Sequence, residues 1–201
     1  MSILDEEHAD LHLPARDLDA AEAAAGRFLD SLGADLGHNA ARTPARMAHA
    51  YAELLTPRSF DLTTFPNDEG YNQLVLVRSV PFASICEHHV LPFIGTADVG
   101  YLPGDRIIGL SKLARVVELF SRRLQVQERM TQQVADWLCE ALHPKGVGVV
   151  VRAEHLCMRL RGVQAEGAST VTSALHGLLL EDPRARDEFM ALTRTTEGSR
   201  R

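Results

Sequence analysis

The chain has 201 residues, of which 45% are hydrophobic and 24% charged, the composition of a globular protein with a proper core. It carries 21 basic and 27 acidic side chains, and the net charge of −6 excludes a protein that mainly coats nucleic acid. Three widely spaced cysteines exclude a disulfide-stapled secreted scaffold. With no signal peptide or membrane-length apolar stretch, we expect a cytoplasmic protein that binds neither nucleic acid nor membrane.

The N-terminal part of the chain is predicted to be helical. Apolar residues recur at helical spacing over 17–36, which predicts an amphipathic helix closed by Gly37. Thr43 resembles a helix N-cap with Pro44 at the first helical position, so a second helix should run to about residue 55. A loop rich in Pro, Asp and Asn is expected over 56–70.

Strands and helices alternate in the rest of the chain. Short β-branched runs broken by Gly and Pro predict strands over 73–85, 93–101, 106–110, 147–161 and 169–180. Helical periodicity over 111–142 indicates one long helix or two helices joined near 121–124, and a short helix is expected from Asp182. This order predicts an α+β fold. The expected division is a helical segment at 1–60, a catalytic domain at 61–192 and a disordered tail at 193–201.

The densest cluster of chemically active side chains is Cys86-Glu87-His88-His89, at the end of a predicted strand. A Cys-x-x-His spacing lets one turn aim a thiolate and an imidazole at a common point, as metal binding requires. The alternative is a buried cysteine beside surface histidines. The spacing leaves open whether His88 or His89 would be the ligand.

A second cluster lies on the predicted strand 153–161, where side chains should alternate between two faces. The polar face would hold His155, Cys157, Arg159 and Arg161, and the apolar face, packed on the core, would hold Leu156, Met158 and Leu160. Two thiolates and one imidazole would make a three-ligand zinc site with an open position for a water nucleophile. Spare histidines would carry protons. The alternative is an exposed sheet edge with incidental polar residues.

Basic residues at the start of the predicted helix 111–142 suggest an anion site. Lys112 and Arg115, next to Ser111, are three residues apart and share a helix face near the helix N-terminus. The alternative is a solvated basic face. Arg161 would lie ~13 Å beyond Cys157 on a strand, comparable with the reach from a purine base to the end of its triphosphate.

Later in this helical region, Gln127 and Glu128 could read the amide and amine edge of a guanine, because a carboxylate accepts from two neighbouring N–H donors. The alternative is the wet face of a helix. The third cysteine, Cys139, is expected to be an inert packing residue.

Together these motifs resemble the GTP cyclohydrolase I family. The resemblance rests on CEHHVLPFIG, GYLPGDRIIGLSKLARVVELFSRRLQVQERMTQQVADWL, GVGVVVRAEHLCMRLRGVQ and STVTS, collinear from about Thr43 to Phe189. It implies zinc-dependent conversion of GTP and water to 7,8-dihydroneopterin triphosphate and formate, the first step of tetrahydrofolate or pterin biosynthesis. It also implies the tunnelling fold, an antiparallel sheet with long helices on one side. In that family the strands close into barrels in a homodecamer of pentameric rings, with active sites between subunits.

The resemblance also implies a role for each matching residue. The zinc ligands would be Cys86, His89 and Cys157, which selects His89 over His88. The catalytic residues would be His88, His155, Gln127 and Ser111, with both histidines transferring protons. The substrate-binding residues would be Glu128 for guanine and Lys112, Arg115, Arg161 and Arg46 for the ribose and triphosphate. Asp98 stands where many family members carry histidine or another residue, and it touches none of these motifs.

Two other hypotheses compete with this one. The first is the related nitrile reductase of queuosine synthesis, which uses a cysteine nucleophile and a nicotinamide cofactor without zinc. The complete set of Cys86, His89 and Cys157 argues against it. The second is a catalytically silent protein that holds zinc or a purine nucleotide as a regulator, and the presence of His88, His155 and Glu128 argues against that.

Overall fold

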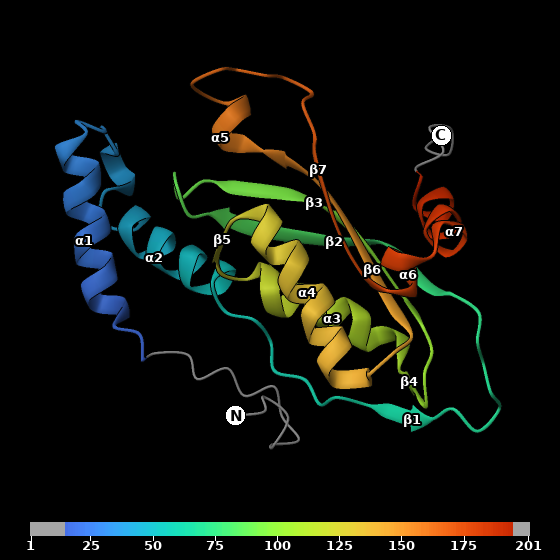
Figure 1. The fold of residues 1–201 in the computed structure, drawn as a ribbon. Helices are drawn as coiled ribbons and strands as arrows, with labels where there is room; N and C mark the ends of the chain where they lie inside the picture. Colours follow the sequence, from blue (N-terminus) through green and yellow to red (C-terminus); the bar gives the residue numbers. More distant parts are fainter. Residues whose placement is uncertain (1–14, 195–201) are drawn as a thin grey trace, which may run out of the picture. The chain divides into compact units, whose positions relative to one another are not determined.

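The computed structural model describes residues 15–194, which fall into two compact units, 15–56 and 57–194. The N-terminal unit holds α1 (Leu18–Ser31), η1 (Gly37–Asn39) and α2 (Thr43–Leu54) (Figure 1). Asp17 caps α1 by accepting a hydrogen bond from the Ala20 amide at 2.9 Å. The prediction that this helix extends to Gly37 is wrong, because the chain turns at Gly33, whose φ of +67° lies in the left-handed region.

Helix α2 begins one residue earlier than predicted. Thr43 is its first helical residue and not its cap, and Pro44 follows in the first turn. Proline is tolerated there because the N–H groups of the first turn have no acceptor within the helix. Arg16 joins the start of α1 to the end of α2. Its guanidinium donates to the carbonyl oxygens of Ala52 and Leu55, each at 2.6 Å.

The second unit mixes strands and helices, which confirms the predicted α+β class. Its strands are β1 (Thr64–Pro66), β2 (Val75–Cys86), β3 (Pro92–Leu102), β4 (Arg106–Ile108), β5 (Leu124–Gln125), β6 (Gly146–His155) and β7 (Thr170–Gly177). Its helices are α3 (Leu110–Ser121), α4 (Gln127–Leu142), α5 (Leu156–Arg159), α6 (Leu178–Glu181) and α7 (Pro183–Thr193). The loop predicted over 56–70 therefore contains the short strand β1.

The main sheet has the strand order β5-β2-β3-β6-β7 and is antiparallel except that β5 runs parallel to β2. Strands β1 and β4 form a separate antiparallel pair. In the main sheet Ile85 pairs with Pro92, and the next residue, Phe93, pairs with His155. This register brings the C-terminal ends of β2 and β6 to the same end of the sheet.

Helices cover both faces of this sheet. The odd-numbered residues of 147–151 on β6 are fully buried in the core cluster that includes α3 and α4, the two long helices in front of the sheet in Figure 1. Val150 faces the other way and packs with Phe189 of α7. Gly148 shares that second face, and a Cβ there would lie 2.7 Å from the Phe189 ring. The close approach of α7 therefore requires glycine at this position.

Residues 111–142 form two helices, the second of the two predicted alternatives. Helix α3 ends at Ser121, and the chain makes the short strand β5 before α4 begins at Gln127. The buried Gln125 side chain fixes this connection by donating from Nε2 to the Phe120 carbonyl at 2.9 Å and to Gln133 Oε1 at 2.8 Å.

A buried ion pair lies within the sheet. Asp98 Oδ2 is 2.6 Å from Arg152 Nη1, and Asp98 Oδ1 accepts a hydrogen bond from the Ser79 amide at 2.7 Å. Ser79 has a φ of +55° at an irregularity between β2 and β3. Arg152 Nη2 donates to the Thr193 carbonyl at 2.8 Å. Asp98 was expected to touch none of the sequence motifs, but it contacts Arg152 within one of them and ties three strands to the end of α7.

The C-terminal part of the described chain follows the prediction with one difference. The predicted strand 169–180 ends at Gly177, where φ is +54° and the chain turns into α6. Asp182 caps α7 as expected, accepting from the Arg184 amide at 3.0 Å. The predicted tail at 193–201 begins with Thr193, which is the last residue of α7, and residues 195–201 and 1–14 lie outside the described residues. Within 15–194, none of the helices combines the length and apolar character needed to cross a membrane.

Candidate active site

The tight loop that joins β2 to β3 carries the first group of candidate residues. The Cys86 amide donates to the Leu91 carbonyl at 2.9 Å, and the Val90 amide donates to the Cys86 carbonyl at 2.8 Å. Val90 has a φ of +55°, which is strained for a β-branched residue. The closed loop holds Cys86 buried at its base, with His88 and His89 exposed at its tip.

Cys157 reaches the site from a helical turn, so the predicted strand 147–161 is wrong beyond His155. The backbone changes from extended to helical at Leu156, and α5 follows. Cys157 is 8% exposed, whereas Met158 and Leu160, predicted to pack on the core, are 39% and 63% exposed. Successive side chains on a helix are about 100° apart and do not alternate between two faces, so the predicted division of this segment into a polar and an apolar face is wrong.

The same change alters the expected distance to Arg161. Four residues of helix rise only about 6 Å, compared with ~13 Å for a strand. Arg161 lies exposed in the bend that follows α5. The agreement between the strand distance and the length of a nucleoside triphosphate therefore no longer supports its role.

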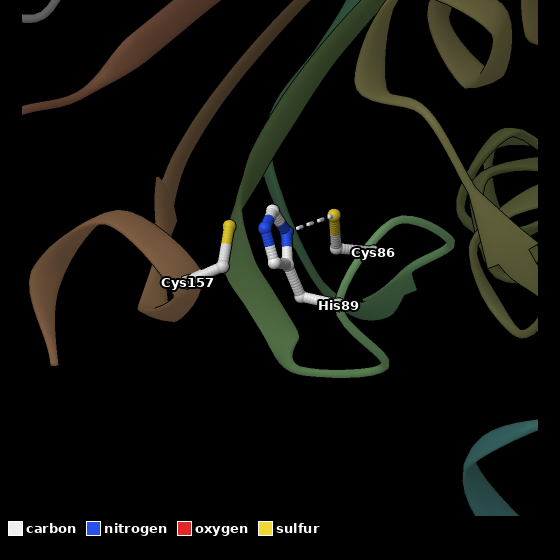
Figure 2. Close-up of side chains that lie close together, drawn as sticks. All are labelled: Cys86, His89 and Cys157. Carbon is white, nitrogen blue, oxygen red and sulfur yellow. Dashed lines mark hydrogen bonds between the residues drawn. The ribbon is translucent and has the colours of Figure 1, made fainter. Parts of the chain in front are cut away.

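The donor atoms of Cys86, His89 and Cys157 lie within 4.8 Å of one another, a geometry that could hold a metal ion. Figure 2 shows the His89 ring between the two sulfur atoms, with His89 Nδ1 3.9 Å from Cys86 Sγ. Across 15–194, no other group of three or more such residues comes together in this way. His88 Nδ1 is also 3.9 Å from Cys86 Sγ, but His88 does not join the group that contains Cys157.

The electrostatics of the two thiols fit a bound cation. Burial raises the pKa of Cys157, and the neighbouring Cys86 raises it further, because two thiolates so close together repel each other. A divalent ion would offset that repulsion and stabilise both thiolates. Two sulfur donors and one imidazole suit zinc, and a single additional ligand would complete a tetrahedral shell.

Next to this group, His155 is held in a defined orientation by Gln127. Gln127 Nε2 lies 3.1–3.2 Å from three oxygen acceptors, the Val151 and Thr170 carbonyls and Thr172 Oγ1. The amide nitrogen therefore points to them, and Gln127 Oε1 accepts from His155 Nε2 at 2.8 Å. A neutral His155 consequently carries its proton on Nε2 and leaves Nδ1 as the proton acceptor.

The environment of His155 favours this neutral form. Its ring stacks on Phe93, with centroids 4.6 Å apart and an interplanar angle of 2°. Burial lowers the pKa of His155, and the opposing charge of Glu128 only partly offsets that effect. Glu128 itself is exposed in the first turn of α4.

Helix α4 is also tied to the β2–β3 loop. Arg129 forms an ion pair with Glu87, the residue between Cys86 and His88. Glu87 Oε1 is in turn 4.0 Å from His88 Nε2. Glu128, the candidate guanine ligand, therefore belongs to a helix that is connected directly to the candidate metal loop.

The basic residues of α3 lie in its first two turns. Ser111 is exposed, and Lys112 is half-buried with its ammonium 5.9 Å from the centre of the Phe60 ring. Arg115 is half-exposed and donates to Glu118 at 3.2 Å. Arg46 lies in α2, in the other compact unit, and its part in the site stays a prediction.

Several residues that shape the site were not predicted from the sequence. Phe93, which stacks on His155, and Thr172, which accepts from Gln127, are far from their partners in sequence. Glu118 could have been found, because it is three residues from Arg115 and four from Arg122, both of which contact it.

Comparison with known proteins gives consistent matches over most of the chain. A family model described as GTP cyclohydrolase I matches residues 21–194. GTP cyclohydrolase 1 of Aquifex aeolicus is 48% identical over 168 residues, covering 83% of this chain and 91% of that protein. The protein of the same name from Mycobacteroides abscessus is 49% identical over 182 residues, covering 88% and 89%. The Homo sapiens GTP cyclohydrolase 1 is 53% identical over 128 residues, covering 64% and 51%.

Proposed function

The chain belongs to the GTP cyclohydrolase I family, and we propose that it performs that reaction with a zinc ion bound by Cys86, His89 and Cys157. Its function is that of a GTP cyclohydrolase I, an enzyme that converts GTP and water to 7,8-dihydroneopterin triphosphate and formate. This is the first step of pterin and folate biosynthesis. The observation that carries the proposal is the convergence of two thiols and one imidazole within 4.8 Å, in a chain matched by the family model over 21–194.

The substrate would be held at its two ends. The Glu128 carboxylate would accept from the guanine amide and amine, a pairing that fixes the base in one orientation. Ser111, Lys112, Arg115 and Arg161 would bind the ribose and triphosphate, and Arg46 would add a further phosphate contact. The basic face of α3 supports this assignment, because Lys112 and Arg115 lie in the first two turns of that helix.

The metal ligands would define where hydrolysis takes place. A bound zinc ion supplies Lewis-acid polarisation and an activated water for hydrolysis at C8 of the purine. Cys86 and Cys157 would bind as thiolates, and His89 through the Nδ1 atom that faces Cys86 Sγ. The hydrogen bonds of the Cys86 backbone with Leu91 and Val90 hold the loop closed, so two of the three ligands have little freedom to move.

The reaction opens the imidazole ring, releases C8 as formate, rearranges the ribose and closes the pterin ring, and each stage moves protons. His155 would accept a proton at Nδ1, because Gln127 holds Nε2 in a hydrogen bond. His88, exposed at the tip of the loop that carries Cys86 and His89, would be the second proton carrier. Gln127 would act by fixing the orientation and tautomer of His155.

The catalytic domain would be the segment 61–192, with the tunnelling fold of the family and the helical segment 1–60 before it. We expect its strands to close into barrels in a homodecamer of pentameric rings, with active sites between subunits. The main sheet supports this expectation, because it is open at both edges: β5 has only two residues, and β7 exposes Val171. A cytoplasmic location would suit this soluble metabolic enzyme family.

The test is a turnover assay on the purified full chain. Zinc-loaded protein incubated with GTP should release formate and yield the fluorescent oxidised pterin, and removal of the metal by a chelator should abolish both. Cys157→Ser should lose stoichiometric zinc and activity, whereas Arg161→Ala should keep zinc and mainly raise the KM for GTP. Full activity of the metal-free protein, or full zinc and turnover in Cys157→Ser, would refute the metal assignment. Tight GTP binding without product would favour the silent nucleotide-binding protein.

A further inference from the structure

Three arginines surround one carboxylate on the basic side of α3. The Glu118 side chain is only 13% exposed. Its two oxygens receive Arg58 Nε at 2.6 Å and Nη2 at 2.7 Å, Arg115 Nη1 at 3.2 Å, and Arg122 Nε at 3.3 Å. Arg58 comes from the segment before β1. Arg115 lies one turn before Glu118 on α3, and Arg122 is the C-cap residue of that helix, one turn after Glu118.

The contacts in this group are unequal. Arg58 forms a two-pronged pair with both carboxylate oxygens, the strongest geometry available to an arginine and a carboxylate. Arg115 gives Glu118 a single N–H at a longer distance, so most of the five N–H donors of its guanidinium remain outside this contact. Glu118 therefore fixes the direction of Arg115 while Arg58 takes up most of its negative charge.

The titration of Glu118 agrees with this division of roles. Burial alone would raise the pKa of Glu118, but the hydrogen bonds and charge of Arg58, followed by the charge of Arg122, outweigh burial and lower it. Glu118 thus remains ionised at neutral pH, as an anchor for Arg115 requires.

We propose that Glu118 is a positioning residue that holds Arg115 for the substrate triphosphate, and that Arg58 makes this possible by balancing the charge of Glu118. The inference rests on the proposed function, in which Arg115 binds the triphosphate. Without Arg58, the Glu118 carboxylate would be free to take Arg115 in a closer pair and would repel the incoming polyanion. Loss of Arg58 should therefore weaken GTP binding only while Glu118 carries its charge.

The test is a double-mutant cycle on the zinc-loaded holoenzyme, with Arg58→Ala, Glu118→Gln and the combined variant. Arg58→Ala should raise the KM for GTP by about fivefold with unchanged kcat, the upper range for an exposed ion pair. Glu118→Gln should also raise the KM, because the anchor of Arg115 is lost. Adding Arg58→Ala to Glu118→Gln should change the KM no further. Arg58→Lys, which keeps the charge, should recover most of the affinity.

The matched control is Arg184→Ala, which removes an exposed arginine from α7 and should leave the KM unchanged. Equal effects of Arg58→Ala with and without Glu118→Gln, a fall in kcat at constant KM, or a lower KM in Glu118→Gln would each overturn the inference. Binding of inorganic tripolyphosphate by calorimetry should follow the same order of variants. A wild-type protein that makes no product would contradict the proposed function, whereas the tripolyphosphate series would still test the inference.

Discussion

Neutralising Asp98 should destabilise the fold, because this residue forms a buried ion pair with Arg152. The Asp98 side chain is 4% exposed and faces Arg152 at 2.6 Å. Asp98→Asn keeps the shape and an oxygen acceptor for the Ser79 amide, so the main loss is the charge opposite Arg152. Removing one partner of a buried pair costs about 3–5 kcal/mol, because the other charge stays desolvated. Arg152 is 24% exposed and can be partly rehydrated, so we expect about 2–3 kcal/mol.

The assay is urea unfolding at a fixed protein concentration, followed by the fluorescence of Trp137, the only tryptophan in the chain. Asp187→Asn is the matched control, because it makes the same chemical change at an exposed position of α7. Asp98→Asn combined with Arg152→Met should recover part of the loss, since the stranded charge is gone. If Asp98→Asn costs no more than the control, within about 0.5 kcal/mol, the ion pair does not stabilise the sheet.

Three further predictions concern Gln127, Glu118 and Cys139. Gln127→Leu should keep zinc but lower kcat by about a hundredfold, because His155 loses the partner that orients it; an unchanged kcat would contradict the role given to Gln127. Because the folded-state pKa of Glu118 lies below its ordinary value of 4.5, its contribution to stability is present above that value and is lost as the pH falls through the folded pKa. The free energy of unfolding of the wild type should therefore fall more steeply below about pH 5 than that of Glu118→Gln, and equal slopes would contradict this. The pKa of Cys139 is raised by burial, then by the charges of Asp136 and Glu140, so iodoacetamide should modify it slowly at pH 7.5. Cys139→Ala should retain full activity, and a large loss would show that Cys139 does more than pack.

The sequence predicted elements whose signals are local. The Pro44 helix start, the Asp182 cap and the periodicity of α3 and α4 depend on neighbouring residues, and each corresponds to an element of the structure. The prediction failed at Cys157, where apolar alternation resembled a strand although the chain turns into α5. Met158 and Leu160 were expected in the core but are exposed, so the hydrophobic character of these two residues did not indicate burial.

The candidate site was predictable in its residue types but not in its connections. Cys86, His88 and His89 share one loop, and their residue types favoured a metal site, but only the family resemblance selected His89 over His88. The orientation of His155 depends on Gln127, which in turn depends on acceptors on β6 and β7. Such contacts arise from the sheet register and leave no periodic trace in the sequence.

The strand β5 has a consequence for how the chain tolerates changes in length. Ile85 and Cys86 pair with Leu124 and Gln125, and the Glu87 amide donates to the Gln125 carbonyl at 3.0 Å. The connection between α3 and α4 is thereby hydrogen-bonded to the base of the candidate metal loop. Inserting or deleting a residue between Ser121 and Gln127 would shift β5 and with it Cys86. The exposed segment 162–169, which follows Arg161, has no strand partner to displace. We therefore expect insertions and deletions in the loop after α5 to be tolerated, and insertions and deletions next to β5 to abolish function.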